Sequence, residues 1–243
     1  GGYPNGDNSI SHHGKSFREM QTSPIFRSGF EANNPEVKVS CADRALLAWI
    51  VVMEHLHDLP RSLQLRASLG SDYTVSMGFG LHLGWAIEGA IGSEHKVDPS
   101  YLSPHVNVAS RLEAATKQYG VPLLMSSSFF HALESAHNRR YCRKIDCVTV
   151  KGSHEKMFLY TYDIWHDCKE HVLFGDYSEY KAKFEAAVDL YLIGRWRDAR
   201  LALLECKELW PRDKPADVLL AYMGENQNLP PPQWAGVRKL TEK

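Results

Sequence analysis

The stretch "YTVSMGFGLHLGWAIEGAIG" (residues 73–92) sets the expected architecture of this chain. Apolar side chains at Val75, Met77 and Phe79 alternate with small or polar ones, and the alternation continues to Leu83. A period of two residues predicts a strand, and Gly84 then allows a turn before a second strand begins. The many glycines favour close backbone packing between this extended segment and its neighbours.

The next recognisable segment, "SYLSPHVNVASRLEAATKQYG" (residues 100–120), follows a loop and predicts a helix that ends at Gly120. Asn107 and Arg111 lie one turn apart on the flank of the helix, beside its apolar stripe. Four residues spaced by three or four positions form that stripe: Val108, Leu112, Ala115 and Tyr119. We expect the stripe to pack on the sheet and the flank to face a crevice at the edge of the sheet.

Further elements on both sides complete a mixed pattern. The segment 41–60 predicts a buried helix capped by Asp43, and 121–126 predicts a short buried strand. A short helix follows, and two strands within 141–164 predict a closing hairpin. The alternation of helices and strands predicts an α/β (α+β) sandwich with a mixed or antiparallel sheet over residues 42–165.

The composition changes at both ends of this region. Residues 1–41 are rich in Gly, Asn, Ser and Pro, without a lasting period, and predict a flexible loop or insertion. Residues 177–223 predict an α-helical hairpin joined at Gly194, with a short third helix, in an arrangement similar to a tetratricopeptide (TPR) repeat. Residues 224–243 are broken by prolines and predict a peripheral tail.

The bulk properties exclude several classes of function. A formal net charge of -1 over 243 residues gives no reason to expect nucleic acid or an anionic membrane as a partner. No apolar run approaches the roughly 20 residues of a membrane span. Five cysteines, an odd number at scattered positions, argue against a disulfide framework and favour a cytoplasmic setting. The histidines show no metal-ligand spacing, so we expect no metal site within this chain.

Two interpretations of the polar helix residues stay open on spacing alone. Asn107 can cap the helix and Arg111 can pair with a surface carboxylate, or both can bind a phosphorylated ligand at the helix N-terminus. Lys151 lies where one strand turns into the next, where a lysine is either solvated or able to reach a phosphate.

Three blocks in order resemble the C-terminal half of the class III nucleotidyl (adenylyl/guanylyl) cyclase catalytic domain. They are "GFGLHLGWAIEGAIGS", "DPSYLSPHVNVASRLEAATKQYG" and "VTVKG" with "LYTYDI", and the resemblance covers residues 42–164. It implies a ferredoxin-like fold and a dimer with the active site between protomers. It also implies a lyase that converts a nucleoside triphosphate to a 3′,5′-cyclic nucleotide and pyrophosphate in signal transduction, with two Mg²⁺ or Mn²⁺ ions.

The resemblance gives five residues expected roles. Asn107 matches the asparagine that orients the ribose, and Arg111 matches the arginine that stabilises charge on the phosphates in the transition state. Lys151 matches the lysine that binds the triphosphate. Ser100 falls on the position that reads the base, with Asp98 as the alternative if the loop shifts. A serine reads either purine, so the substrate is ATP or GTP, with a slight preference for adenine.

The chain departs from the family in lacking its two metal-binding aspartates, which belong to the N-terminal half. The pair Gly6-Asp7 has no flanking apolar strand and does not replace them. Because the sequence begins with Gly1 and a loop-like stretch, we expect a fragment that is inactive alone, with the metal ligands supplied by the missing half.

Several alternatives remain for the whole protein. We expect a homodimer or a paired cyclase domain, in the cytoplasm or in the cytosolic part of a larger membrane or cytoskeletal protein. The main alternative is a non-catalytic cyclase-homology module for dimerisation or scaffolding. A nucleotide-binding regulator without turnover is a third.

Overall fold

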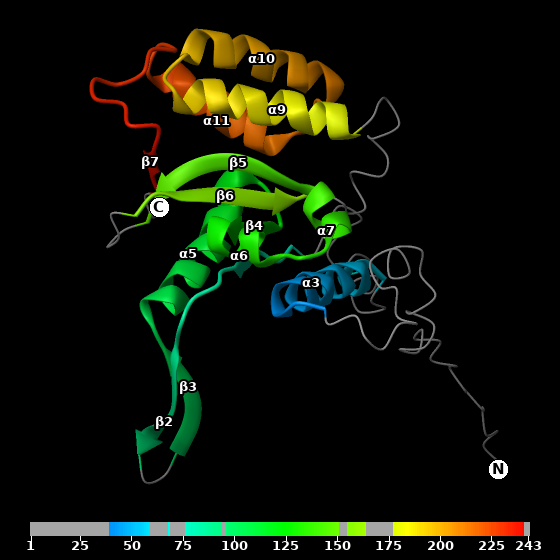
Figure 1. Ribbon diagram of the computed structural model, residues 1–243, viewed down its shortest axis with the longest axis vertical. Coiled ribbons are helices and arrows are strands. Elements are labelled where there is room, and N and C mark those ends of the chain that lie inside the picture. The colour runs from blue at the N-terminus through cyan, green and yellow to red at the C-terminus, as the bar shows by residue number, and fades with distance from the viewer. Residues whose placement is uncertain are drawn as a thin grey trace, which may run out of the picture. The chain divides into compact units, whose positions relative to one another are not determined.

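A five-stranded mixed sheet forms the centre of the described part of the computed structural model (Figure 1). The structure describes residues 39–58, 68, 76–93, 96–150, 155–163 and 177–240, all within the unit Val39–Lys243. The expected flexible segment up to residue 38 and the predicted site residue Lys151 lie outside these ranges. Within them, no helix has the length and apolar character that crossing a membrane requires.

The sheet has the order β1-β4-β6-β5-β7, and its strands run in both directions. β1 pairs with β4 in parallel, β6 pairs antiparallel with both β4 and β5, and β7 lies parallel to β5. The strands are β1 (Phe79–Leu81), β4 (Leu123–Ser126), β5 (Cys142–Thr149), β6 (Met157–Tyr162) and β7 (Arg238–Lys239). The expected α/β class is therefore confirmed, and so is the closing β5–β6 hairpin.

Helix α5 (Pro104–Tyr119) packs on β1 and β4 through a buried stripe. The buried residues are Leu112, Ala115, Thr116 and Tyr119. The predicted close packing of the glycines is confirmed at β1, because a Cβ on Gly80 would lie 2.2 Å from the carbonyl oxygen of Ala109. Gly120 ends the helix in the left-handed conformation, with φ 63°.

The expected loop before α5 is in fact a strand, so that expectation is wrong. β2 (Ile87–Ser93) and β3 (Lys96–Leu102) form a separate antiparallel pair, with Ile87 opposite Leu102 and Ser93 opposite Lys96. Proline and aspartate within β3 hid the strand, since both residue types are rare in sheets. An edge position on a two-stranded ribbon tolerates both.

The long N-terminal helix α3 (Cys41–Asp58) begins at a different cap from the one expected. The Ser40 hydroxyl accepts the amide N–H of Asp43 at 3.0 Å and donates to its carboxylate at 2.6 Å, so Ser40 is the cap. Asp43 also accepts the backbone N–H groups of Glu134 and Ser135. It thereby joins α3 to the junction of α6 (Ser127–Ala132) and α7 (Ala136–Arg140).

The predicted helical hairpin is present as α9 (Tyr177–Leu192) and α10 (Trp196–Leu209), followed by α11 (Lys214–Glu225). Gly194 makes the turn with φ 85°. Tyr191 and Trp196 stack at 5.5 Å between ring centroids across that turn. Helix α9 packs on β5 (Figure 1). One hydrophobic cluster contains side chains from the sheet, from α5 and from all three C-terminal helices.

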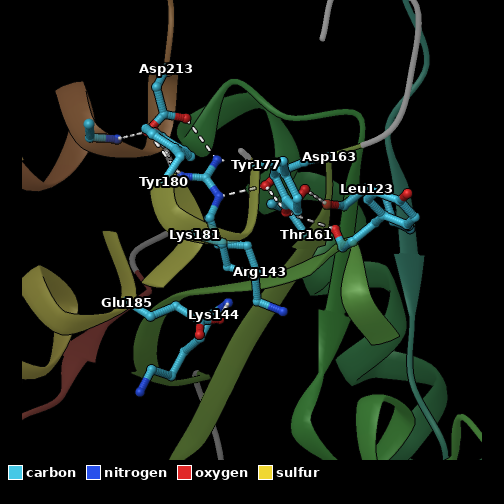
Figure 2. Close-up of polar contacts among 12 residues, drawn as sticks. Leu123, Arg143, Lys144, Thr161, Asp163, Tyr177, Tyr180, Lys181, Glu185 and Asp213 are labelled. Atoms are coloured by element: carbon cyan, nitrogen blue, oxygen red, sulfur yellow. Dashed lines mark hydrogen bonds and ion pairs between the residues drawn. The ribbon is translucent and has the colours of Figure 1, made fainter. Parts of the chain in front are cut away.

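A buried cluster of charges joins the hairpin to the sheet, as Figure 2 shows. Arg143 of β5 donates to Asp163 at 2.6 Å and 3.2 Å, and to Asp213 at 3.0 Å and 2.8 Å. The hydroxyl of Tyr177 donates to Asp163 at 2.8 Å. These two carboxylates raise the pKa of Arg143 in spite of its burial, which by itself would lower it. The guanidinium therefore stays charged between the sheet and α9–α11.

The segment after α11 is not peripheral, so that expectation is wrong. Its residue Arg238 extends the sheet as part of β7 and lies 2.8 Å from the buried carboxylate of Asp146. The Arg238 guanidinium also lies over the rings of Tyr119 and Tyr222, at 5.0 Å and 5.1 Å from their centroids. The proline-broken sequence gives no periodic signal for this strand of two residues.

Candidate functional site

Helix α5 presents two of the predicted site residues away from the core. Asn107 is exposed and Arg111 is partly exposed, whereas the stripe beside them is buried. Residues four apart on a helix lie on the same face, so both side chains leave α5 on the same side, one turn apart. The structure thus brings Asn107 and Arg111 together on the flank of the helix, as the periodicity predicts.

The first turn of α5 is fixed by Ser103 and not by Asn107. The Ser103 hydroxyl accepts the N–H of His105 at 3.0 Å and donates to the carbonyl oxygen of Trp85 at 2.5 Å. Pro104 follows as the first helical residue, where its missing N–H costs nothing. The interpretation of Asn107 as the helix cap is therefore wrong, and its amide is available for another role.

Two histidines connect this turn to the sheet. His82, directly after β1, has its Nε2 at 2.8 Å from Nδ1 of His105. Its other nitrogen, Nδ1, lies 2.8 Å from the hydroxyl of Ser126, which is buried at the end of β4 and caps α6. A chain of polar contacts thus runs from α5 through β1 to β4.

The two candidate base-reading residues lie on β3, ahead of α5. Ser100 is partly buried and stands opposite Gly89, and Asp98 stands opposite Ile91. Side chains two apart on a strand share a face, so Asp98 and Ser100 point to the same side of the ribbon. The Asp98 carboxylate is exposed and lies 3.1 Å from the ammonium of Lys96.

Several buried carboxylates elsewhere are already bonded to protein donors. Hydrogen bonds from Ser40 and Asn138 and from two backbone N–H groups hold the pKa of Asp43 below its ordinary value, although burial opposes them. The carboxylates saturated in this way are Asp43, Asp146, Asp163 and Asp213. In the described ranges no three His, Cys, Asp or Glu side chains could hold a metal ion together. These residues therefore do not fit a pair of divalent ions, and no chemical step is assigned to one.

Three of the four described cysteines are buried, and Cys41 is exposed. Cys41, Cys142, Cys147 and Cys206 are all free thiols. Burial raises the pKa of Cys206 to about 11, so its nucleophilic thiolate is scarce at neutral pH.

A cavity of about 960 Å³ lies between α11, the C-terminal segment and the ends of β5 and β6. Gln118, Tyr222, Trp234 and Arg238 are among its lining residues. Of the predicted site residues that the structure describes, none is among its lining residues.

Some residues of the site were not predicted from the sequence. The contact between His82 and His105 joins residues 23 positions apart, and neither histidine belongs to a recognisable ligand spacing. Pro104, between Ser103 and His105, marks the start of the helix but gives no sign of a contact with His82.

Comparison with curated protein sequences gives relatives that are named adenylate cyclases. The chain is 28% identical over 174 residues to an adenylate cyclase of Dictyostelium discoideum, termed terminal-differentiation specific, covering 68% of this chain and 8% of that protein. It is 33% identical over 119 residues to an adenylate cyclase of Anabaena cylindrica, covering 49% of this chain and 24% of that protein. No family model matches the chain.

Among solved structures, the guanylyl cyclase Cya2 aligns with a TM-score of 0.42 and 20% identity, over 55% of this chain and 63% of that one. The chain spans less than a quarter of the length of the two curated relatives, 8% and 24%. The sequence relatives and the ordered motifs agree, and the chain is similar to the class III nucleotidyl cyclases.

Proposed function

We propose that this chain supplies the asparagine–arginine side of a nucleotidyl cyclase active site. The observation that carries the proposal is the flank of α5, where Asn107 and Arg111 leave the helix one turn apart beside a buried stripe. The match of "VNVASRLE" to the family motif supports it, as do the printed names of the relatives. The product would be a 3′,5′-cyclic nucleotide, formed by an intramolecular reaction of one nucleoside triphosphate.

In this reaction the ribose 3′-oxygen attacks the α-phosphorus, the bond from that phosphorus to the bridging oxygen breaks, and pyrophosphate leaves. The 3′-hydroxyl releases its proton to a base or to water. Arg111 offers a planar set of N–H donors that would stabilise the charge developing on the phosphate oxygens. Asn107 both donates and accepts, and it would hold the ribose so that its 3′-oxygen faces the phosphorus. Lys151, outside the described residues, would bind the triphosphate.

We propose ATP as the substrate, with GTP as the alternative. The two curated sequence relatives are named adenylate cyclases, and Ser100 at the base-reading position can hydrogen-bond either purine. Asp98 lies on the same face of β3 and remains the second candidate for this role. A carboxylate accepts only, so it would bond to an amino group, which adenine carries at C6 and guanine at C2.

Two Mg²⁺ or Mn²⁺ ions, expected by resemblance, would polarise the 3′-hydroxyl and the phosphates. Their ligands would have to come from outside the described residues. In the proposed assembly they come from a segment with the two family aspartates, either upstream in the same protein or on a paired domain. This part of the proposal predicts that the 243-residue chain alone has little or no cyclase activity.

We further propose a homodimer or a paired cyclase domain as the working assembly. The β2–β3 ribbon exposes large apolar side chains, with Ile87, Val97 and Leu102 each more than 60% exposed, at 62%, 63% and 66%. Trp85, just before the ribbon, is 60% exposed. Ile87 and Leu102 are cross-strand partners with side chains on the same face, and exposed apolar side chains grouped in this way mark interaction surfaces. A second copy of the cyclase region is the partner that would complete the site.

The test is nucleotide binding by the chain, measured by isothermal titration with ATP and with GTP in the presence of Mn²⁺. We expect Arg111→Ala to weaken binding about tenfold or more and Asn107→Ala to weaken it a few-fold, as loss of charged and neutral hydrogen bonds would. Lys117→Ala is the matched control, because Lys117 is an exposed cation in the last turn of the same helix. Unchanged affinity in both variants would refute the proposed roles.

The alternatives give different outcomes. A dimer in analytical ultracentrifugation without any nucleotide binding favours the scaffold module. Saturable binding that needs no metal, with no turnover after a segment carrying the two aspartates is added, favours a nucleotide-binding regulator. Rapid turnover by the 243-residue chain alone would contradict the expectation that this chain lacks the two metal-binding aspartates.

A further inference from the structure

The contact between His82 and His105 lies at the base of the first turn of α5, two residues before Asn107. Their facing nitrogens are 2.8 Å apart, and the rings lie 5.0 Å apart between centroids. On the other side of its ring, the Nδ1 of His82 lies within hydrogen-bond distance of the hydroxyls of Ser126 and Ser128, at 2.8 Å and 3.3 Å. The position of His105 is thus coupled to two other elements of the fold.

The His105 ring packs closely against the backbone of Gly84. A Cβ on Gly84 would lie 2.1 Å from its Cγ, so only glycine permits the ring to lie there. The indole of Trp85 meets the ring edge-on, with 5.9 Å between centroids. Ser103 caps the same turn and bonds to the Trp85 carbonyl oxygen. Residues on either side of the ribbon, Trp85 before β2 and Ser103 after β3, therefore fix where α5 begins.

The number of protons on the two rings decides whether the contact can exist. Two neutral imidazoles, or one neutral and one charged, place a single hydrogen between Nε2 of His82 and Nδ1 of His105. When both rings are charged, each of these nitrogens carries a hydrogen and neither accepts. Two like charges at this distance repel each other, and the positive end of the α5 dipole adds to that repulsion. Burial and the proximity of His105 lower the pKa of His82, which agrees with this geometry.

Other ionisable groups near His82 do not change this balance. Helix α5, which packs on β1, carries His105, Arg111, Glu113, Lys117 and Tyr119. Helix α6 carries His131, and β4 carries no ionisable side chain. Of these groups, His105 is the one whose nitrogen lies at hydrogen-bond distance from the ring of His82.

We propose that His82 and His105 are a proton-sensitive positioning pair, which fixes the first turn of α5 and the site residue Asn107 while at least one ring is neutral. Uptake of the second proton breaks the contact and loosens the turn. The role of Asn107 toward a nucleotide rests on the proposed function, whereas the behaviour of the turn does not. The consequence is a site that is ordered at neutral pH and loses order in acid.

The test is amide hydrogen exchange of residues 108–111 in the whole chain between pH 7.5 and pH 5, corrected for the intrinsic exchange rate. Protection in the unaltered chain should fall about three- to tenfold in acid, the equivalent of one hydrogen bond. His105→Asn keeps a bonding atom near the position of Nδ1 without a charge, so it should retain protection at both pH values. His105→Ala should lose protection at both.

The control is His131→Asn, which removes an exposed histidine from α6 and should behave as the unaltered chain does. In addition, NMR titration of the His82 ring should show an upward shift of its midpoint in His105→Asn, because the neighbouring charge is gone. Three results would each overturn the proposal: no acid loss of protection in the unaltered chain, the same acid loss in His105→Asn, or full protection in His105→Ala.

These measurements need no nucleotide, so the two proposals fail separately. If hydrogen exchange shows the expected acid loss of protection but Asn107→Ala does not change nucleotide binding, the proposed function alone is refuted. Loss of nucleotide binding in Asn107→Ala, together with protection of residues 108–111 that does not change with pH or with the His105 variants, would refute the positioning pair alone.

Discussion

Replacement of Arg143 by methionine is expected to lower the free energy of unfolding by about 3–5 kcal/mol. Arg143 is 1% exposed, and it is the cation between two carboxylates, Asp163 and Asp213, that are 5% and 2% exposed. Methionine fills a similar volume but leaves both carboxylates buried without the cation. The remaining donors, the hydroxyl of Tyr177 and the N–H of Ala216, bond to the two carboxylates but bring no charge.

The assay is urea denaturation followed by circular dichroism, with thermal melting as a second measurement. For a unit of this size, 1 kcal/mol corresponds to about 2–4 °C, so the melting temperature should fall by about 6–20 °C. Because Asp213 caps α11 and Asp163 follows β6, the hairpin and the sheet should lose structure in one transition.

The matched control is Arg200→Met on α10, where the arginine is exposed, and its effect should stay within about 0.5 kcal/mol. A second variant combines Arg143→Met with Asp163→Asn and Asp213→Asn, which removes the uncompensated charges and should recover part of the loss. A loss below about 1 kcal/mol in Arg143→Met would refute the reasoning, because it would mean that the buried carboxylates do not need the guanidinium.

Three further predictions concern packing, the C-terminal segment and pH. Gly80→Ala should destabilise the chain by about 1–3 kcal/mol in urea denaturation because β1 and α5 must separate, whereas Gly89→Ala, with nothing within 4 Å of the new Cβ, should not. Arg238→Met leaves Asp146, which is 0% exposed, without its cation and should cost about 3–5 kcal/mol by the same assay; a neutral result would show that the Asp146 carboxylate does not need this cation. The pKa of His82 lies below its ordinary 6.5, so the unfolded chain binds more protons there; stability should fall as the pH drops below about 6.5, and His82→Gln should reduce that fall in denaturation curves at pH 7.5 and 5. An equal pH dependence in both chains would contradict this assignment.

Local sequence patterns were sufficient to predict the amphipathic helices and the turn between α9 and α10. The period of α5 predicted its buried stripe and the exposed flank with Asn107 and Arg111, and Gly194 predicted the turn between α9 and α10. Both follow from short-range geometry, because a helix repeats every 3.6 residues and glycine tolerates positive φ. The order of motifs then predicted the similarity to cyclases, although the roles of the site residues stay predictions.

The pairing of strands β3 and β7 was not predictable in this way. Strand β3 depends on its partner β2 for its hydrogen bonds, and its own composition argues against a strand. The same holds for β7, whose two residues join the sheet through pairing with β5 and the ion pair with Asp146. A strand without an apolar period is held by the hydrogen bonds of its partner strand, and its own residues do not show where that partner lies.

The sequence by itself determined the α/β class, the helical hairpin, the packing role of the glycines and the residues that stand on the flank of α5. Only the tertiary structure decided that Ser103 caps that helix, that His82 meets His105, and that Arg143 joins the hairpin to the sheet. Periodicity and turn chemistry act within about ten residues and are readable along the chain. Contacts between single polar groups depend on distances set by the packing of whole elements, and these exist only once the chain has folded.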